Sequence, residues 1–111
     1  MSYSRDFESV RIDGPLIRVD ATSIDDATGE PGTEDPATAF YVAIVKSQGG
    51  TATDVSLPVK PGVDSTWTAE FPGAARHYRR GEQVYVIGVA LNEGAAPDVW
   101  QETHTVGTRT G

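Results

Sequence analysis

The sequence predicts an all-β fold, an antiparallel β-sandwich of about seven strands. Short runs of β-branched and aromatic residues recur along the chain, and glycine, proline, aspartate or asparagine separates them. Residues 73–83 are bounded by glycines and have almost no apolar face, so they support a single helical turn at most. A chain of 111 residues with 38% hydrophobic composition fits one domain around one core, residues 1–111.

The first strand region, residues 8–24, contains two alternating patterns in opposite phase. Its apolar positions are Val10 and Ile12, then Ile17, Val19 and Ala21. Because a one-residue change of phase turns side chains to the other face, we expect a kink at Gly14 and Pro15. Proline cannot donate to a strand ladder, which predicts an edge strand, with residues 1–8 as a candidate N-terminal arm.

The segment 25–36, DDATGEPGTEDP, is the most acidic in the chain. Calcium binds six to eight oxygens, and the candidate ligands are Asp25, Asp26, Glu30, Glu34 and Asp35. Their spacing lacks the alternating acids of a calcium loop. Glycine, proline and aspartate are also typical of a long solvated connection between strands. We interpret the segment as an acidic loop, with calcium binding as the lesser alternative.

Five further strands are expected. They lie within residues 37–47, 51–59, 66–72, 81–94 and 98–109. The strand at 66–72 alternates cleanly, which places one face inward and one in solvent. The strands at 37–47 and 81–94 are instead apolar on both faces. The second face of these two strands predicts an interface, formed by Tyr41, Ala43, Val45, Tyr85, Ile87, Val89 and Leu91. The alternative is that the protein's own loops or N-terminal segment cover it.

Residues 65–94, STWTAEFPGAARHYRRGEQVYVIGVALNEG, resemble the bacterial immunoglobulin-like domains of surface proteins, adhesins and phage virion proteins. The residues that carry the resemblance are Trp67 at the core position, Gly81 and Glu82 at the turn, and Val84 and Val86 at inward positions. These are mostly packing residues, so the resemblance implies a fold, an immunoglobulin-like sandwich, far more than an activity.

Composition and charge exclude several function classes. The net charge of −7 disfavours binding to a phosphate backbone, and the basic residues cluster only at 76–80, RHYRR. The chain contains no cysteine, which removes disulfides, thiol catalysis and cysteine-type zinc sites. No apolar run approaches the roughly 20 residues that cross a bilayer, so we expect no membrane insertion. The N-terminus lacks the pattern of a signal peptide.

Candidate chemistry elsewhere is sparse. His77 and His104 are too few for a typical histidine metal site, and no nucleophile motif accompanies them, so we expect no cofactor, no metal and no catalysis. Arginine forks suit carboxylates and phosphates. The candidate contacts to a partner or ligand are therefore Arg76, Arg79, Arg80 and the aromatic Trp100.

The expected function is a non-catalytic structural or interaction module, a building block of a larger assembly. The resemblance favours a phage decoration, capsid-surface or tail protein, or a bacterial surface module, located in a virion or at the cell surface. Protein partners or self-association are expected. The alternative is a carbohydrate-binding module, in which Trp100 with Tyr78 or Tyr85 forms a planar row. The third hypothesis is a small enzyme, which would need a pocket with convergent polar groups.

Overall fold

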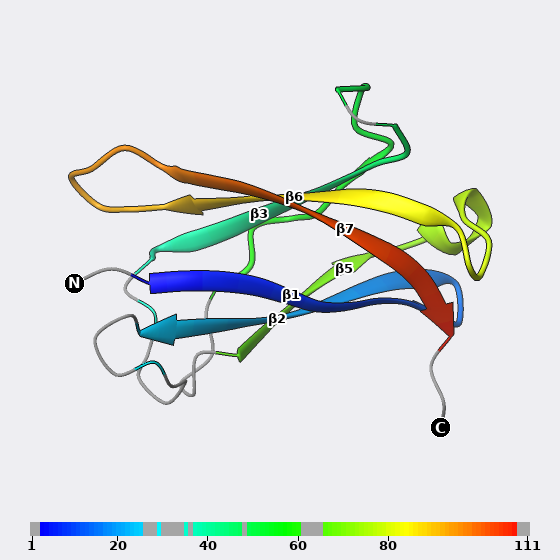
Figure 1. Cartoon of the computed structure of the whole chain (residues 1–111), viewed down its shortest axis with the longest axis horizontal. Coiled ribbons are helices and arrows are strands. Elements are labelled where there is room, and N and C mark those ends of the chain that lie inside the picture. Colours follow the sequence, from blue (N-terminus) through cyan, green and yellow to red (C-terminus); the bar gives the residue numbers. More distant parts are fainter. Residues whose placement is uncertain are drawn as a thin grey trace.

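A computed structural model gives the fold of residues 3–25, 29, 35, 37–47, 49–60 and 66–108 (Figure 1). The molecule measures 39 × 32 × 20 Å along its principal axes. The elements are β1 (Tyr3–Asp13), β2 (Leu16–Asp25), β3 (Ala39–Val45), β4 (Asp54–Val55), β5 (Thr66–Phe71), the 3₁₀ turn η1 (Ala74–His77), β6 (Gln83–Leu91) and β7 (Asp98–Thr108). The single helical turn therefore lies where the sequence allows one. No helix of the described residues is long and apolar enough to cross a membrane.

The strands form one mixed sheet in the order β4-β3-β6-β7-β1-β2-β5. All neighbouring pairs are antiparallel except β1 and β7, which pair in parallel over three positions beginning at Val10 and Val106. The sheet curls on itself and is nearly barrel-shaped, so that β1, β2 and β5 face β4, β3, β6 and β7 (Figure 1). The all-β prediction is confirmed, whereas the immunoglobulin-like sandwich stays a prediction because the two halves belong to one continuous sheet.

The region at 8–24 is a hairpin and not a kinked edge strand. Gly14 has a φ of 60° and occupies, with Pro15, a two-residue turn between the paired residues Asp13 and Leu16. Such a turn favours glycine at its first position. Residues that pair across the turn, such as Ile12 and Ile17, have one even and one odd residue number. This explains why the apolar residues fall at even positions before the turn and at odd positions after it. Both strands are internal to the sheet, so the edge-strand prediction is wrong.

A β-bulge in β1 keeps Phe7 in the core. Phe7 pairs with Ala21 and Ser9 pairs with Asp20, which leaves Glu8 as the extra residue. If Glu8 were instead paired regularly, Phe7 would be out of phase with Val10 and point to the opposite face. Phe7 is buried, and the described part of the candidate N-terminal arm is a paired part of β1.

One hydrophobic cluster joins the two halves of the sheet. Phe40 of β3 stacks on Trp67 of β5, with ring centroids 4.0 Å apart. Phe7 stacks on Trp100 of β7 at 5.3 Å. Burying side chains of this size contributes roughly 2–3 kcal/mol each to stability. The inward alternation predicted for residues 66–72 is confirmed, since Trp67, Ala69 and Phe71 are all buried.

The edge next to β3 is short and irregular. Of the strand predicted at 51–59, only Asp54–Val55 is a strand, followed by an isolated bridge between Val59 and Phe40. The backbone N–H of Val42 donates to the hydroxyl of Ser56, and the backbone N–H of Ser56 donates to the carbonyl of Val42. The side chain thereby replaces one backbone acceptor, and regular pairing ends there.

Candidate functional site

The second face of β3 and β6 is a partly exposed apolar surface. The register places Ala43 opposite Ile87 and Tyr41 opposite Val89, and all four side chains are half-buried. Leu91 and Tyr85 lie on the same face with similar exposure. We call this surface the outer face.

The neighbouring strands extend the outer face. Val99 of β7 lies opposite Val89 and is 66% exposed, and Val55 of β4 lies opposite Ala43 and is 63% exposed. Leu57, just beyond β4, is 75% exposed. Isolated exposed apolar residues are ordinary, but a contiguous apolar surface over four strands is typical of an interaction site.

Val45 is the one member of the predicted interface that is fully covered. It is 2% exposed, although it pairs with the half-buried Tyr85. The turn after β3 folds over it, where the backbone N–H of Gly50 donates to the carbonyl of Ser47 at 2.9 Å. The chain's own loop therefore covers one end of the predicted interface, and the remaining six residues stay accessible.

The second candidate site is an open pocket of about 660 Å³ around η1. Its lining residues are Lys46, Arg76, His77, Tyr78, Arg79, Arg80 and Glu82. Gly73 and Gly81 flank the segment with φ values of 74° and 90°, a region in which other residues are strained. We call this site the basic pocket. It brings together the three arginines predicted as partner contacts and adds Lys46, which the sequence did not associate with them.

Asp54 contacts two of the residues that line the basic pocket, Tyr78 and His77. The Tyr78 hydroxyl donates to an oxygen of Asp54 at 2.7 Å, and Nδ1 of His77 lies 3.2 Å from the same oxygen. Burial, together with the Asp54 carboxylate, raises the pKa of the Tyr78 phenol above its usual value. The phenol, which is protonated at neutral pH in any case, therefore stays protonated and donating in alkaline solution as well.

Lys46 and Glu82 form the rim of the pocket. The Lys46 ammonium lies 3.3 Å from Glu82 and 4.9 Å from the centre of the Tyr78 ring, and it donates to the carbonyl of His77. A hydrogen bond from the backbone N–H of Arg79, reinforced by Lys46, lowers the pKa of Glu82. Both rim charges are thus already paired within the protein.

The arginines of the pocket form no ion pair with a carboxylate among the described residues, although the charge of Arg79 helps to lower the pKa of Glu82. Arg5, Arg11, Arg18 and Lys46 all have carboxylate partners. Within the described part of the chain, the cations without one are Lys60, Arg76, Arg79 and Arg80. Three of these four line one pocket, on a chain whose net charge is −7. The arrangement is able to hold an anion.

The aromatic row considered for sugar binding is not formed. The Trp100 ring packs on the inner face against Gly88, where an added Cβ would lie 2.4 Å from the ring. Tyr78 is buried, and Tyr85 lies on the outer face. These three rings do not share one exposed plane, so they give the carbohydrate alternative no support. Trp100 is likewise separate from the arginines with which the sequence grouped it.

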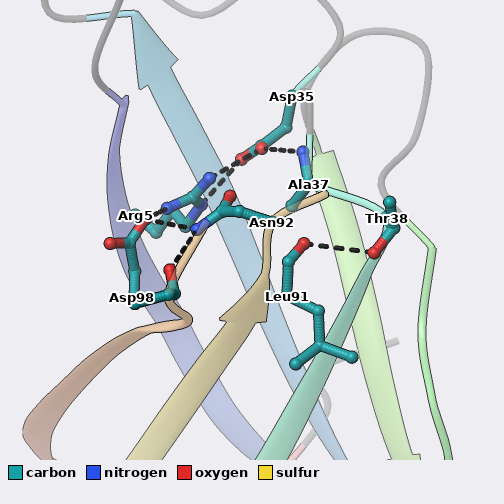
Figure 2. A network of polar contacts seen from close by, with 8 residues as sticks. Arg5, Asp35, Ala37, Thr38, Leu91, Asn92 and Asp98 are labelled. Atoms are coloured by element: carbon teal, nitrogen blue, oxygen red, sulfur yellow. Dashed lines mark hydrogen bonds and ion pairs between the residues drawn. The ribbon is translucent and has the colours of Figure 1, made fainter. Parts of the chain in front are cut away.

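Asp35 is the best-defined member of the acidic segment, and it holds an arginine. Its two oxygens accept from Nε and a terminal nitrogen of Arg5, each at 2.8 Å, and one also accepts from the backbone N–H of Ala37 (Figure 2). Burial disfavours the charged carboxylate, but these hydrogen bonds outweigh it and lower the pKa of Asp35.

Asp98 lies on the solvent side of the same arginine, 3.0 Å away (Figure 2). Arg5 and Asp35 are 30 residues apart, and sequence reasoning missed the pair because no local pattern marks it.

The predicted calcium ligands have no described site. Asp26, Glu30 and Glu34 lie outside the described residues, Asp25 is described at its backbone, and Asp35 is occupied by Arg5. His77 contacts Asp54, whereas His104 contacts Glu102 at 3.1 Å in a different part of the molecule. Across the described ranges, no group of three histidine, aspartate or glutamate side chains is placed to hold a metal.

Comparison with known proteins shows a similarity of fold and no match at the level of sequence. No protein-family model and no curated protein matches the sequence. Among solved structures, the crystal structure of MtrC from Shewanella baltica OS185 is similar, with a TM-score of 0.59 and 11% sequence identity. The alignment covers 96% of this chain and 22% of that one, so the chain spans about a fifth of its length. At this identity the similarity concerns the fold.

Proposed function

We propose that the chain is a non-catalytic interaction module of immunoglobulin-like type, which serves as a building block of a larger assembly. The outer face carries this proposal, because it presents contiguous apolar side chains from four strands that the described residues leave partly exposed. A surface of this kind gains free energy when a protein partner removes it from water.

The strand order supports the immunoglobulin-like part of the proposal. In a sandwich of that type, antiparallel strands form two packed layers with one shared core. Here β3, β4, β6 and β7 form one half, β1, β2 and β5 form the other, and the three-residue parallel pairing of β1 with β7 joins them. Opening that short pairing would give two layers around the same core.

The resemblance at 65–94 favours a virion decoration, capsid-surface or tail protein, or a bacterial surface module, as the kind of assembly. Trp67, Val84 and Val86 occupy inward positions, as the resemblance implies. The same face could bind a second copy or a different protein. Both agree with a structural role.

The test places a charge on the outer face. Ile87→Glu puts an unpaired carboxylate in the middle of the apolar surface, and we expect it to weaken self-association or partner binding at least about tenfold, because burying that charge costs more than 1.4 kcal/mol. Light scattering of the purified chain over a concentration series measures self-association. Pull-down from the native source measures binding of a different partner.

Ala95→Glu is the matched control, since it adds the same charge at an exposed turn between β6 and β7. It should associate as the wild type does. If Ile87→Glu unfolds in a thermal melt, the weaker Val89→Thr is used instead, because it keeps a β-branched side chain while removing apolar area. A folded Ile87→Glu protein that associates like the wild type would refute the role of the outer face.

A further inference from the structure

The segment that carries the three arginines of the basic pocket is anchored near both of its ends. It lies between β5 and β6, at one end of the molecule (Figure 1). Near its start, the backbone N–H of Ala75 donates to the carbonyl of Pro15 at 3.2 Å, and at its end the N–H of Gly81 donates to the carbonyl of Val106 at 2.7 Å. The backbone that carries the arginines is therefore held against the β1–β2 turn and against β7.

Lys46 and Glu82 are committed to the walls of the pocket. Glu82 accepts from the backbone N–H of Arg79 at 2.9 Å and lies 3.3 Å from Lys46. Lys46 in turn donates to the carbonyl of His77 and lies over the ring of Tyr78. The protein's own cation thus balances the carboxylate of the pocket, and the groups left to bind a ligand are the guanidinium groups.

The guanidinium groups of Arg76, Arg79 and Arg80 keep most of their N–H donors for a ligand. Nε of Arg76 donates to Nε2 of His77 at 3.4 Å. Among the described residues, no other side-chain N–H of these three arginines has a hydrogen-bond partner. Glu82 attracts Arg79 without forming an ion pair with it. The pocket therefore presents three arginine forks to whatever enters it.

We propose that these three arginines bind a phosphate or diphosphate group. The oxygens of a phosphate point in tetrahedral directions, so one group accepts from several arginine forks at once. A carboxylate has two oxygens, and a single bidentate arginine occupies both. Three arginines within the five residues 76–80 therefore match a phosphate better than a carboxylate.

The lining of the pocket favours recognition of the phosphate alone. Most small-molecule sites are lined by apolar and aromatic side chains that pack on the body of the ligand. In this pocket the one tyrosine, Tyr78, is 6% exposed and has Lys46 over its ring, and the other lining residues are charged or are the imidazole of His77. The open volume of about 660 Å³ admits a larger molecule, but its organic part meets no apolar surface there.

The cluster does not continue into a track for a nucleic acid, which is bound by cations spaced along its backbone. Within the described ranges, the one cation outside the pocket that lacks a carboxylate partner is Lys60. It follows Val59, which pairs with Phe40 near the start of β3, whereas Lys46 follows the end of that strand. The two lysines are therefore roughly 20 Å apart along β3.

Binding of pyrophosphate, measured by isothermal titration calorimetry, tests the proposal. At pH 7 and about 50 mM salt, we expect one pyrophosphate per chain with a Kd below about 1 mM. Arg79→Gln and Arg80→Gln each remove one fork, and each should weaken binding at least about fivefold. Lys60→Gln removes the same charge outside the pocket and is the matched control. Its affinity should stay within about twofold of the wild type, because salt screens a charge at that distance.

Two further anions test the chemistry of the ligand. Malonate, a dicarboxylate, should bind at least about tenfold more weakly than pyrophosphate, because each of its carboxylates accepts one fork. Adenosine diphosphate carries a diphosphate on an organic body, and its affinity should lie within about threefold of that of pyrophosphate, because the pocket offers the base no surface to pack on.

The proposal is overturned if pyrophosphate does not bind at about 10 mM, if both arginine variants bind it as the wild type does, or if Lys60→Gln loses as much affinity as they do. Malonate that binds as tightly as pyrophosphate would overturn the assignment of phosphate. Adenosine diphosphate that binds more than about tenfold more tightly than pyrophosphate would overturn recognition of the phosphate alone. Circular dichroism verifies that each variant is folded.

The site shares no residue with the outer face and does not rest on the function proposed for that face. Ile87→Glu should therefore bind pyrophosphate as the wild type does, whether or not the outer face forms an interface. The two proposals can thus fail separately.

Discussion

At the scale of single residues, the most consequential contact is the buried pair of Arg5 and Asp35. Their side chains are 5% and 0% exposed, and the arginine also lies 5.5 Å from the centre of the Phe40 ring. A buried pair is a weak source of net stability, because desolvation of two charges offsets their attraction. Removing one partner is different, because it leaves the other charge buried and uncompensated. The pair joins Asp35, which lies shortly before β3, to Arg5 of β1.

Asp35→Asn should lower the free energy of unfolding by about 3 kcal/mol. The amide keeps the size of the side chain and an acceptor for the N–H of Ala37, but it removes the charge that balances Arg5. Urea denaturation at pH 7 measures the change. Asp98→Asn is the matched control, since Asp98 contacts the same arginine with a side chain that is 61% exposed. Its loss should stay below about 1 kcal/mol. If both variants lower the free energy of unfolding by the same small amount, the buried contact of Arg5 with Asp35 contributes no more than the exposed contact with Asp98.

The pH dependence of stability provides an independent test of the pair of Arg5 and Asp35. The pKa of Asp35 is lower in the folded protein than its ordinary value of 3.8. The corresponding stabilisation is complete above that value and is lost as the pH falls through it toward the folded pKa. The wild type should therefore lose its advantage over Asp35→Asn as the pH falls through 3.8 and below it. A constant difference over that range would contradict the assignment.

At the scale of elements, the β1–β2 hairpin shows how turn and bulge together set which side chains are inside. The two-residue turn at Gly14 and Pro15 aligns Ile12 with Ile17, and the bulge at Glu8 then shifts the rest of β1 by one residue. Phe7 enters the core because of that shift, and so does the Arg5 side chain. The bulge at the exposed residue Glu8 thus determines which side chains in the preceding part of β1 face the core.

Deleting Glu8 should therefore remove the bulge but leave Phe7 opposite Ala21 and facing the core, so we expect it to lower the free energy of unfolding by less than about 1 kcal/mol. Guanidinium denaturation measures the loss. Glu8→Ala keeps the bulge and should change stability by no more than about 0.5 kcal/mol, because Glu8 is exposed. A loss of about 3 kcal/mol or more on deletion would contradict this, because it would mean that Phe7 had left the core.

At the scale of the whole molecule, patterns in the sequence predict the fold class better than the connections between strands. Alternation predicts β3, β5 and β6 because each side chain's exposure follows its parity. Alternation alone does not distinguish a kink from a hairpin at Gly14, since both produce a change of phase. The arginine cluster is visible in the sequence, but Lys46 and Asp54 join it through folding across the sheet. The Arg5–Asp35 pair leaves no local signal at all.

The two halves of the sheet share one core, so the molecule should unfold as a single cooperative unit. The chain has two tryptophans, Trp67 in β5 of one half and Trp100 in β7 of the other. Their ring centroids are 6.3 Å apart, and Phe7 contacts both. A cluster this continuous leaves neither half with a core of its own. Loss of either half would expose the aromatic side chains of the other.

Single-tryptophan variants test this directly. Trp100→Phe leaves a fluorescent reporter in β5, and Trp67→Phe leaves one in β7. In each variant, the urea midpoint from fluorescence should coincide with the midpoint from far-ultraviolet circular dichroism, as two-state unfolding requires. Comparing the two probes within one protein removes the effect of the substitution on stability. If one reporter changes at lower urea than the circular dichroism signal of the same variant, that half opens first, and the three-residue pairing of β1 with β7 would be the point at which the sheet separates.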